Sequence, residues 1–319
     1  MFVLYLLVFL LSSFCLAFSS KWLINSLSKI AKILSWKEFV VAFIFLAFSV
    51  SLPNFFVGLI SAFNKIPQLS LGDIVGGNIF DLSVVIALAA FFSKKGLSAP
   101  SRTVQQSNLF LIGITLLFFF LISDHFLSRS DGLFLLFSFF VYVFWLFQKE
   151  ERFKKVYDGL DVKFTPKAFL ENFASFLVSV FVLLVSAKGV VLAAGFFSEN
   201  LHLPLSFIGI FIVGIGDSLP ETFFSLESAK RGEDWLILGD LIGGVIITMT
   251  LVLGLVSLIS PIKISELSLI LSARIFLLLI TVFFFFFLRS DKKISRPEGL
   301  FLIFLYLLFL FVEILITRW

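Results

Sequence analysis

Long apolar runs recur along the whole of this 319-residue chain, and they restrict its fold more than any other feature. A helix needs about 20 residues to cross the hydrocarbon core of a bilayer. Ten runs approach or exceed that length, near residues 2–20, 38–64, 67–93, 104–123, 132–148, 168–197, 205–229, 236–259, 268–288 and 299–317. Hydrophobic residues make up 60% of the chain and charged residues 14%, whereas soluble domains have roughly 45–50% and 25%. The sequence therefore predicts an all-α, polytopic membrane protein of about ten transmembrane helices.

The first apolar run, 2–20, has no basic residues in front of it, as a secretory signal would have, so we expect it to be a membrane span. It contains Cys15, the one cysteine of the chain. A single cysteine permits no intrachain disulfide and no cysteine-based metal site.

The basic residues predict the topology. Nineteen of the 25 Lys and Arg residues fall in alternate loops, including the charged segment 148–167. Cytoplasmic loops carry the excess of Lys and Arg, so we expect this segment inside and both termini outside, in a plasma or inner membrane. The net charge of +4 is spread over these loops and forms no basic stripe, so nucleic acid is not an expected partner.

An internal repeat divides the chain. At an offset of 167 residues, SLPNFFVGLISAFNKIPQLSLGDIVGGNI (51–79) aligns without gaps on SLPETFFSLESAKRGEDWLILGDLIGGVI (218–246). Five spans separate equivalent points, so the second half must enter the membrane in the opposite sense. We expect two inverted five-helix repeats, 1–147 and 168–319, joined by a short cytoplasmic linker, 148–167. Inverted repeats are typical of secondary transporters, whose substrate site lies near the midplane.

Each repeat has a proline in the middle of a span, Pro53 and Pro220. Proline has no N–H, so the carbonyls four residues earlier, at Ser49 and Gly216, are expected to be free. Broken helices occur at membrane depth where they line a cavity, and their carbonyls can coordinate cations. The alternative is an ordinary proline kink, but two at equivalent positions favour a site.

Polar side chains follow the two prolines at matching spacings. Asn54 and Glu221 come directly after them, and Asp81 and Thr248 lie 27 residues further on, each in the next span. An ionisable side chain at the centre of a bilayer costs about 2.5–3.5 kcal/mol even on the lenient insertion scale. We therefore interpret these four residues as a functional polar quartet.

All the groups near the two prolines offer oxygen. The expected ligand set is Asn54, Asp81, Glu221, Thr248, Asp217, Ser51 and Ser218. Ca²⁺ takes 6–8 oxygen ligands in flexible geometry, and soft metals are disfavoured because no Cys or His is near. We expect inorganic cations as substrates, no resident cofactor and no enzymatic activity. The lipid bilayer is the other expected partner.

Asp217 stands one helical turn before Glu221, so the two share a helix face. It is either a third acidic ligand or a proton acceptor. Asp73 and Asp240 are expected to cap the starts of spans; the alternative is a role at the entrance to the site. The spacings Gly72-xxx-Gly76 and Gly239-xxx-Gly243 (239–243) are expected to let helix backbones approach closely.

These motifs resemble the α-repeats of the cation/Ca²⁺ exchanger superfamily, whose signature is similar to G-T-S-L-P-E followed by G-N-x-x-G-S-N-I-F. The matching segments are GDSLPE (216–221) and GDIVGGNIFD (72–81). The resemblance implies Ca²⁺ transport by alternating access, in exchange for Na⁺ or else H⁺. The chain departs from the family pattern at Asn54, where glutamate is usual, and at Asp217, where threonine is usual.

Two other classes of protein share single features with this chain. Gly214–Asp217 spells the GxGD motif of intramembrane aspartyl proteases, and Asp81 could be the second aspartate of a dyad. No Pro-Ala-Leu motif follows, Phe80 replaces the expected tyrosine, and a protease gives no reason for the repeat. A passive cation channel could use the same oxygens, but inverted repeats with paired broken helices favour alternating access.

Overall fold

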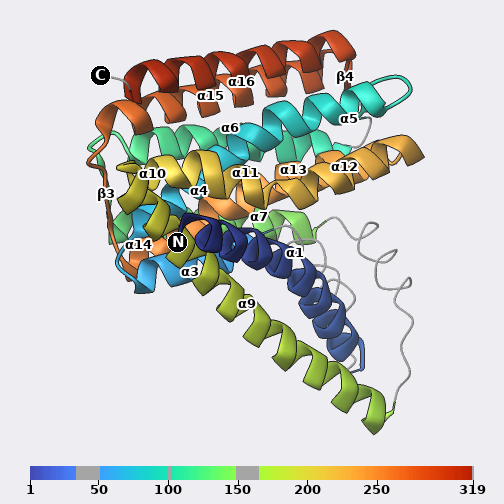
Figure 1. Ribbon diagram of the computed structural model, residues 1–319. Helices are drawn as coiled ribbons and strands as arrows, with labels where there is room; N and C mark the ends of the chain where they lie inside the picture. The colour runs from blue at the N-terminus through green and yellow to red at the C-terminus, as the bar shows by residue number, and fades with distance from the viewer. Residues whose placement is uncertain (34–50, 100–101, 149–164, 318–319) are drawn as a thin grey trace.

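The computed structural model describes residues 1–33, 51–99, 102–148 and 165–317 (Figure 1). Within these ranges, nine helical segments are long and apolar enough to cross a membrane, and Leu52–Phe63 is a shorter apolar helix. The prediction of an all-α membrane protein is confirmed. The predicted span 38–64 and the predicted linker 148–167 lie partly outside the described residues.

The helices of the first half are α1 (Phe2–Ile33), α3 (Leu52–Phe63), α4 (Pro67–Phe80), the π-helical turn η1 (Asp81–Val85), α5 (Ile86–Phe92), α6 (Arg102–Leu121) and α7 (Arg129–Phe147). Those of the second half are α9 (Pro166–Leu201), α10 (Leu205–Ile208), η2 (Gly209–Val213), α11 (Gly214–Asp217), α12 (Leu219–Arg231), α13 (Asp234–Ile247), η3 (Thr248–Val252), α14 (Leu253–Ile259), α15 (Leu267–Ser290) and α16 (Arg296–Thr317).

The sequence offset of 167 residues also relates the elements. Adding it to the bounds of α4, η1 and α5 gives the bounds of α13, η3 and α14. The π-helical turns η1 and η3 begin at Asp81 and Thr248, the repeat-related polar residues of the predicted quartet. Such turns are rare and frequently mark functional sites.

Two short strand pairs join one half to the other. β1 (Leu97–Ser98) pairs antiparallel with β4 (Lys293–Ile294), and β2 (Phe126–Leu127) pairs with β3 (Ile262–Lys263). Figure 1 shows β4 and β3 at opposite ends of the bundle. The pairs therefore fasten the halves together on both sides of the membrane, in agreement with the inverted arrangement.

The long helices α1 and α9 pack against each other and extend away from the rest of the bundle (Figure 1). The predicted first span ends at residue 20, but the helix continues to Ile33. This extension is more polar, and within it the hydroxyl of Ser26 donates to that of Ser175 in α9 at 2.8 Å. The contact between α1 and α9 therefore continues beyond the predicted first span.

Glycines let α4 approach the chain of the second half closely. A Cβ atom at Gly72 would overlap the carbonyl of Ser206, and one at Gly76 would overlap that of Ile210. The predicted close packing is thus confirmed for the first repeat. For Gly243, no atom of the described residues lies within 4 Å of a Cβ atom. Residues 39–43, which the repeat would place opposite it, lie outside the described part.

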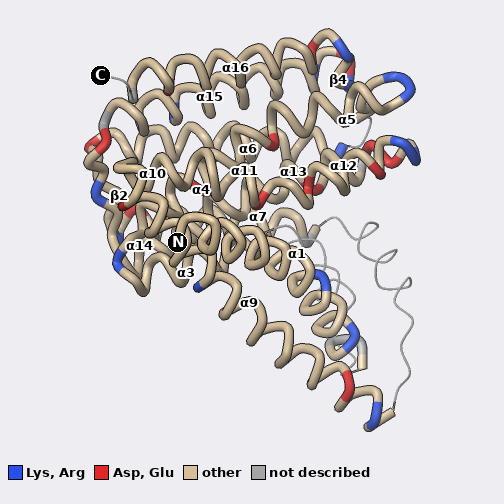
Figure 2. Tube along the Cα trace, viewed as in Figure 1, with Lys and Arg blue, Asp and Glu red and all other residues tan. Residues whose placement is uncertain are grey.

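Charged residues gather at the helix ends, and a few acidic residues lie inside the bundle (Figure 2). Basic residues mark the loops near β4, α5 and α12. β1 and β4 lie in two loops that we assigned to the same side of the membrane, and β2 and β3 lie in two assigned to the other. The strand pairs therefore agree with how the loops were grouped, whichever side is cytoplasmic.

Candidate cation-binding site

The helix of the second repeat is interrupted at Ser218, which ends α11 and precedes α12. Pro220 then lies in the first turn of α12, where its missing N–H removes no helical hydrogen bond. The predicted free carbonyl at Gly216 is wrong, because a backbone N–H at this cap donates to it. In the first repeat, Ser51 precedes α3 with Pro53 in its first turn, and Ser49 lies outside the described residues.

A small buried cavity lies between the starts of α3 and α12 and the π-helical turns η1 and η3. Its volume of about 10 Å³ is room for about one water-sized sphere. Residues of α3, α4, η1, α11, α12, α13 and η3 converge on it. Its lining residues are Asn54, Gly77, Asn78, Asp81, Asp217, Ser218, Glu221, Gly244 and Thr248. Both halves of the chain therefore contribute to one cavity.

Hydrogen bonds around the cavity cross from one half to the other. The Thr248 hydroxyl donates to the Asn78 side-chain oxygen at 3.1 Å and also reaches the Val245 carbonyl at 3.1 Å. The first of these bonds joins a side chain of each half and orients both of them.

Three carboxylates of the cavity have an oxygen with no partner. These buried atoms are Asp81 Oδ1, Asp217 Oδ2 and Glu221 Oε2, and no described residue donates a hydrogen bond to them. Leaving a buried acceptor unpaired is expensive, and a buried charge more so. A positively charged ion or a proton in the cavity would relieve that cost.

The structure brings together six of the seven residues that the sequence suggested as ligands. Ser51 is the exception. It is buried and its hydroxyl has no partner among the described residues, but it does not line the cavity. That any of the six binds an ion stays a prediction.

Sequence reasoning did not select Asn78 as a site residue. Its repeat equivalent is Val245, so the search for matching polar pairs passed over it. Another signal was available, because Asn78 stands three residues before Asp81 and therefore on the same helix face. Its oxygen accepts from Thr248, and its amide nitrogen has no partner among the described residues.

Asp73 and Asp240 do not cap helices, contrary to expectation. Each stands six residues after the start of its helix, α4 or α13, because these helices begin at Pro67 and Asp234. Asp73 is fully buried, and the Asn54 amide donates to it at 3.3 Å. It therefore forms a layer behind the cavity lining and orients Asn54.

No three acidic, His or Cys side chains of the described residues converge tightly enough to hold a metal ion alone. Amide and hydroxyl oxygens of the cavity would have to complete the shell. Such mixed oxygen donors suit hard cations such as Ca²⁺.

Comparison with known proteins identifies the family of this chain. The family model described as "Sodium/calcium exchanger protein" matches residues 4–148 and 171–315, which covers both repeats. The chain belongs to this family. Membership makes it a transport protein of the antiporter type and confirms the superfamily that the motifs suggested.

Two curated relatives match over nearly their whole length. The chain is 26% identical to "Sodium/calcium exchanger MaX1" of Methanosarcina acetivorans, over 96% of this chain and 97% of the relative. It is also 26% identical to "Putative antiporter CaxA" of Alkalimonas amylolytica, over 92% and 93%.

Solved structures share the fold. The sodium-calcium exchanger NCX_Mj superposes with a TM-score of 0.63 at 24% identity, over 97% of this chain and 98% of that one. The H⁺/Ca²⁺ exchanger CAX superposes with a TM-score of 0.77 at 18% identity, over 98% and 85%. The fold is thus common to exchangers that are named for different counter-ions.

Proposed function

We propose that this protein moves Ca²⁺, or a similar hard cation, across the membrane in exchange for Na⁺ by alternating access. The observation that carries the proposal is the cavity, where six side chains from the two inverted repeats present oxygen and three carboxylates keep an unpaired oxygen. Family membership makes antiport the expected mode of transport.

The charge of the cavity favours a cation as the substrate. Its described lining includes Asp81, Asp217 and Glu221 and no Lys or Arg. Buried carboxylates without a counter-charge are strongly destabilising. Each half contributes at least one acid, so a divalent ion between the halves would neutralise charge from both.

The arrangement of the cavity is suited to alternating access. Its walls come from helix starts and π-helical turns of two inverted repeats, the features that surround midplane sites in secondary transporters. A rearrangement of one repeat against the other would open the same cavity to either side. A passive channel needs a continuous pore instead, and this cavity is closed to little more than one water.

Exchange against H⁺ is the second candidate. When a divalent cation leaves, the cavity carboxylates must gain other positive charge, and both Na⁺ and protons meet that need. The departures from the family pattern at Asn54 and Asp217 change which cavity side chains are acidic, so the counter-ion has to be measured.

We propose transport and not peptide hydrolysis, although Asp81 and Asp217, the two aspartates of the intramembrane protease hypothesis, line the same cavity. The family match spans both repeats, and proteolysis gives no reason for an inverted repeat. Peptide cleavage by the purified protein in detergent would contradict this choice.

The direct test is initial-rate Ca²⁺ uptake into proteoliposomes with outward Na⁺, H⁺ or K⁺ gradients imposed one at a time. We expect the Na⁺ gradient to drive uptake and the K⁺ gradient, matched for osmolarity, not to. Uptake driven by H⁺ alone would select the second candidate. Uptake that ignores all three gradients would exclude an antiporter.

A further inference from the structure

A hydroxyl stands at the third residue of each π-helical turn that begins at a cavity residue. These residues are Ser83 of η1 and Thr250 of η3, which the 167-residue offset relates. Both are fully buried, and neither lines the cavity. The Ser83 hydroxyl donates to the Ile79 carbonyl, and the Thr250 hydroxyl donates to the Ile246 carbonyl at 2.5 Å. Donor and acceptor are therefore both repeated in the two halves.

Each of these hydrogen bonds spans the residue that lines the cavity. Asp81 stands midway between Ile79 and Ser83 in the chain. Thr248 has the same place between the acceptor of the second bond and its donor, Thr250. The bond therefore links the chain before the cavity residue to the chain after it.

The helix is wider than an α-helix at these two places. In an α-helix each N–H donates to the carbonyl four residues earlier. Here the Ile86 N–H donates to the Asp81 carbonyl and the Leu253 N–H donates to the Thr248 carbonyl, five residues earlier in each case. The extra residue breaks the regular series of backbone bonds. A side-chain bond across the turn supplies a constraint that the backbone series lacks there.

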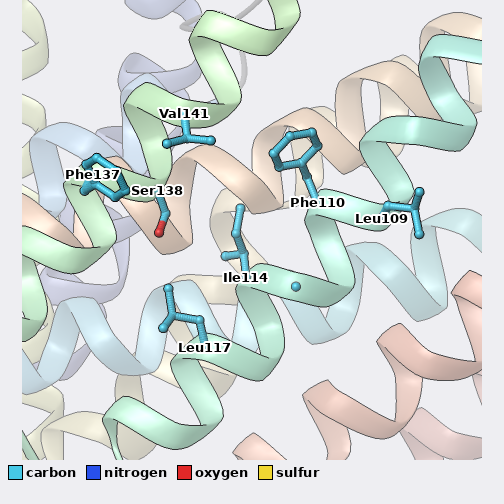
Figure 3. A pocket seen from close by; sticks show the side chains of 8 residues that line it. Leu109, Phe110, Ile114, Leu117, Phe137, Ser138 and Val141 are labelled. Carbon is cyan, nitrogen blue, oxygen red and sulfur yellow. The ribbon is translucent and has the colours of Figure 1, made fainter.

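A hydroxyl that donates to the carbonyl four residues earlier is ordinary in membrane helices and does not by itself indicate a function. Figure 3 shows Ser138 of α7 at an apolar groove between α6 and α7. Its hydroxyl donates to the Phe134 carbonyl at 2.9 Å, and Ser257 of α14 makes the same kind of bond at 2.8 Å. Ser83 and Thr250 differ from both because their bonds cross a π-helical turn and a cavity residue.

The remaining π-helical turn of the described residues shows that such a turn forms without a hydroxyl. This turn, η2, has Phe211 at its third residue, and none of its five residues lines the cavity. The hydroxyls thus accompany the two turns that present a side chain to the cavity. Helix formation alone therefore does not account for them.

We propose that Ser83 and Thr250 are positioning residues for the cation site. Each hydroxyl fixes its π-helical turn so that Asp81 or Thr248 presents its oxygen to the cavity. Neither hydroxyl touches the ion, and each acts through the residue two positions earlier. An ion binds more tightly where its ligands are held in place beforehand, because less freedom is lost on binding. The inference rests on the proposed binding of a hard cation in this cavity.

The test compares two replacements of Thr250 in the purified full-length protein. Thr250→Val keeps the volume of the side chain and removes the hydroxyl, whereas Thr250→Ser keeps the hydroxyl and removes a methyl group. Isothermal titration calorimetry measures the affinity for Ca²⁺. We expect Thr250→Val to weaken it about threefold to tenfold, the effect of losing one hydrogen bond, and Thr250→Ser to stay near wild type. The reverse order would show that packing matters and not the hydroxyl, and would overturn the proposal.

Ser83→Ala tests the first half in the same way, and Ser257→Ala is the matched control. Ser257 is fully buried, lies in the same membrane span as Thr250 and donates to the carbonyl four residues earlier, but it stands outside the π-helical turn. We expect weaker Ca²⁺ binding in Ser83→Ala and wild-type binding in Ser257→Ala. Equal affinities in these two variants would overturn the proposal.

Thermal unfolding without Ca²⁺ separates positioning from stability. Ser83→Ala and Thr250→Val should unfold at about the temperature of Ser257→Ala. A much lower temperature, or failure to fold, would show that the hydroxyls maintain the fold instead and would overturn the proposal. Wild-type protein that binds no Ca²⁺ would contradict the proposed function itself. Wild-type binding with unchanged affinity in Ser83→Ala and Thr250→Val would overturn the positioning role alone.

Discussion

At the residue scale, each carboxylate of the cavity has a buried oxygen to which no described residue donates a hydrogen bond. Glu221 Oε2 and Asp81 Oδ1 have no partner among the described residues, and they come from different halves. In a stable fold such groups are a cost that function has to explain.

Glu221→Gln and Asp81→Asn should each reduce Ca²⁺ transport by about tenfold or more, equivalent to about 1.4 kcal/mol. Losing either charge leaves a divalent ion incompletely neutralised in a medium of low dielectric constant. The folded protein should be as stable or more so, because a neutral amide is cheaper to bury. Initial-rate flux and thermal unfolding at matched protein levels check both effects.

Glu227→Gln is the control on the same helix as Glu221. Glu227 is exposed and pairs with Arg231 at 3.0 Å, so its replacement should leave transport intact. Near-normal flux in Glu221→Gln would remove the basis for the site, because this residue has both cavity contact and the family motif.

Asn54→Ala and Thr248→Ala remove neutral oxygens and should weaken transport less than the two carboxylate variants. A hydrogen bond from a neutral group contributes roughly 0.5–1.5 kcal/mol. Ca²⁺-dependent thermal stabilisation, compared across the four variants, measures the difference. Losses larger than those of Asp81→Asn would mean that the carboxylates are not the main ligands.

Asp217→Asn distinguishes a ligand from a proton site. Because Asp217 lines the cavity with a free oxygen, we expect weaker Ca²⁺ affinity at every pH. Unchanged affinity with a shifted pH profile of flux would instead assign the proton role. Flux measured over a pH series at several Ca²⁺ concentrations decides between them.

At the scale of elements, backbone contacts position the site. The starts of α3 and α12 and the turns η1 and η3 place the polar side chains. The glycines of α4 allow that helix to lie directly against the η2 region. These contacts hold the helix that carries Asn78 and Asp81 against the helix that leads into Ser218.

Gly76→Ala should destabilise the protein by about 1–3 kcal/mol, because its new Cβ atom would overlap the backbone of Ile210. Gly195→Ala, on α9, should be neutral or slightly stabilising through helix propensity, because no atom of the described residues lies within 4 Å of the added Cβ atom. Thermal unfolding in detergent compares them. Equal midpoints would show that α4 does not pack this closely in the membrane.

At the scale of the whole molecule, two inverted halves are fastened at both membrane faces. Asp234 of α13 strengthens one face, since its carboxylate accepts from the Ser98 backbone at 3.0 Å and the Ser93 hydroxyl at 3.3 Å. At the other face, the Gln68 amide of α4 donates to the Lys263 carbonyl at 3.2 Å. Each contact joins the first half to the second.

The orientation of the molecule remains a prediction from its basic residues. Single cysteines in segment 149–163 and at the C-terminus, in a Cys15→Ser background, should be labelled from opposite sides of the membrane. Impermeant maleimide should reach the C-terminal cysteine in intact cells and the linker cysteine after permeabilisation alone. Linker labelling in intact cells would reverse the assignment.

The membrane fold, the repeat and most of the cavity lining followed from sequence. The length of the apolar runs is sufficient to predict membrane helices, because a bilayer accepts helices whose backbone N–H and C=O groups are paired within the helix. The equal spacing from Asn54 to Asp81 and from Glu221 to Thr248 correctly predicted four residues of the cavity lining. It did so because equivalent residues in a repeat occupy equivalent places. Which of these residues bind ions is still to be tested.

Tertiary structure decided what depends on contacts between segments far apart in the chain. The role of Asn78 follows from a Thr248 hydroxyl 170 residues away, and the burial of Asp73 follows from helices that pack on α4. Gly113 is exposed and Ile280 is buried, although the two hold equivalent positions in the repeat. Periodicity shows which faces of a helix are apolar, but only packing determines whether that surface meets protein or lipid.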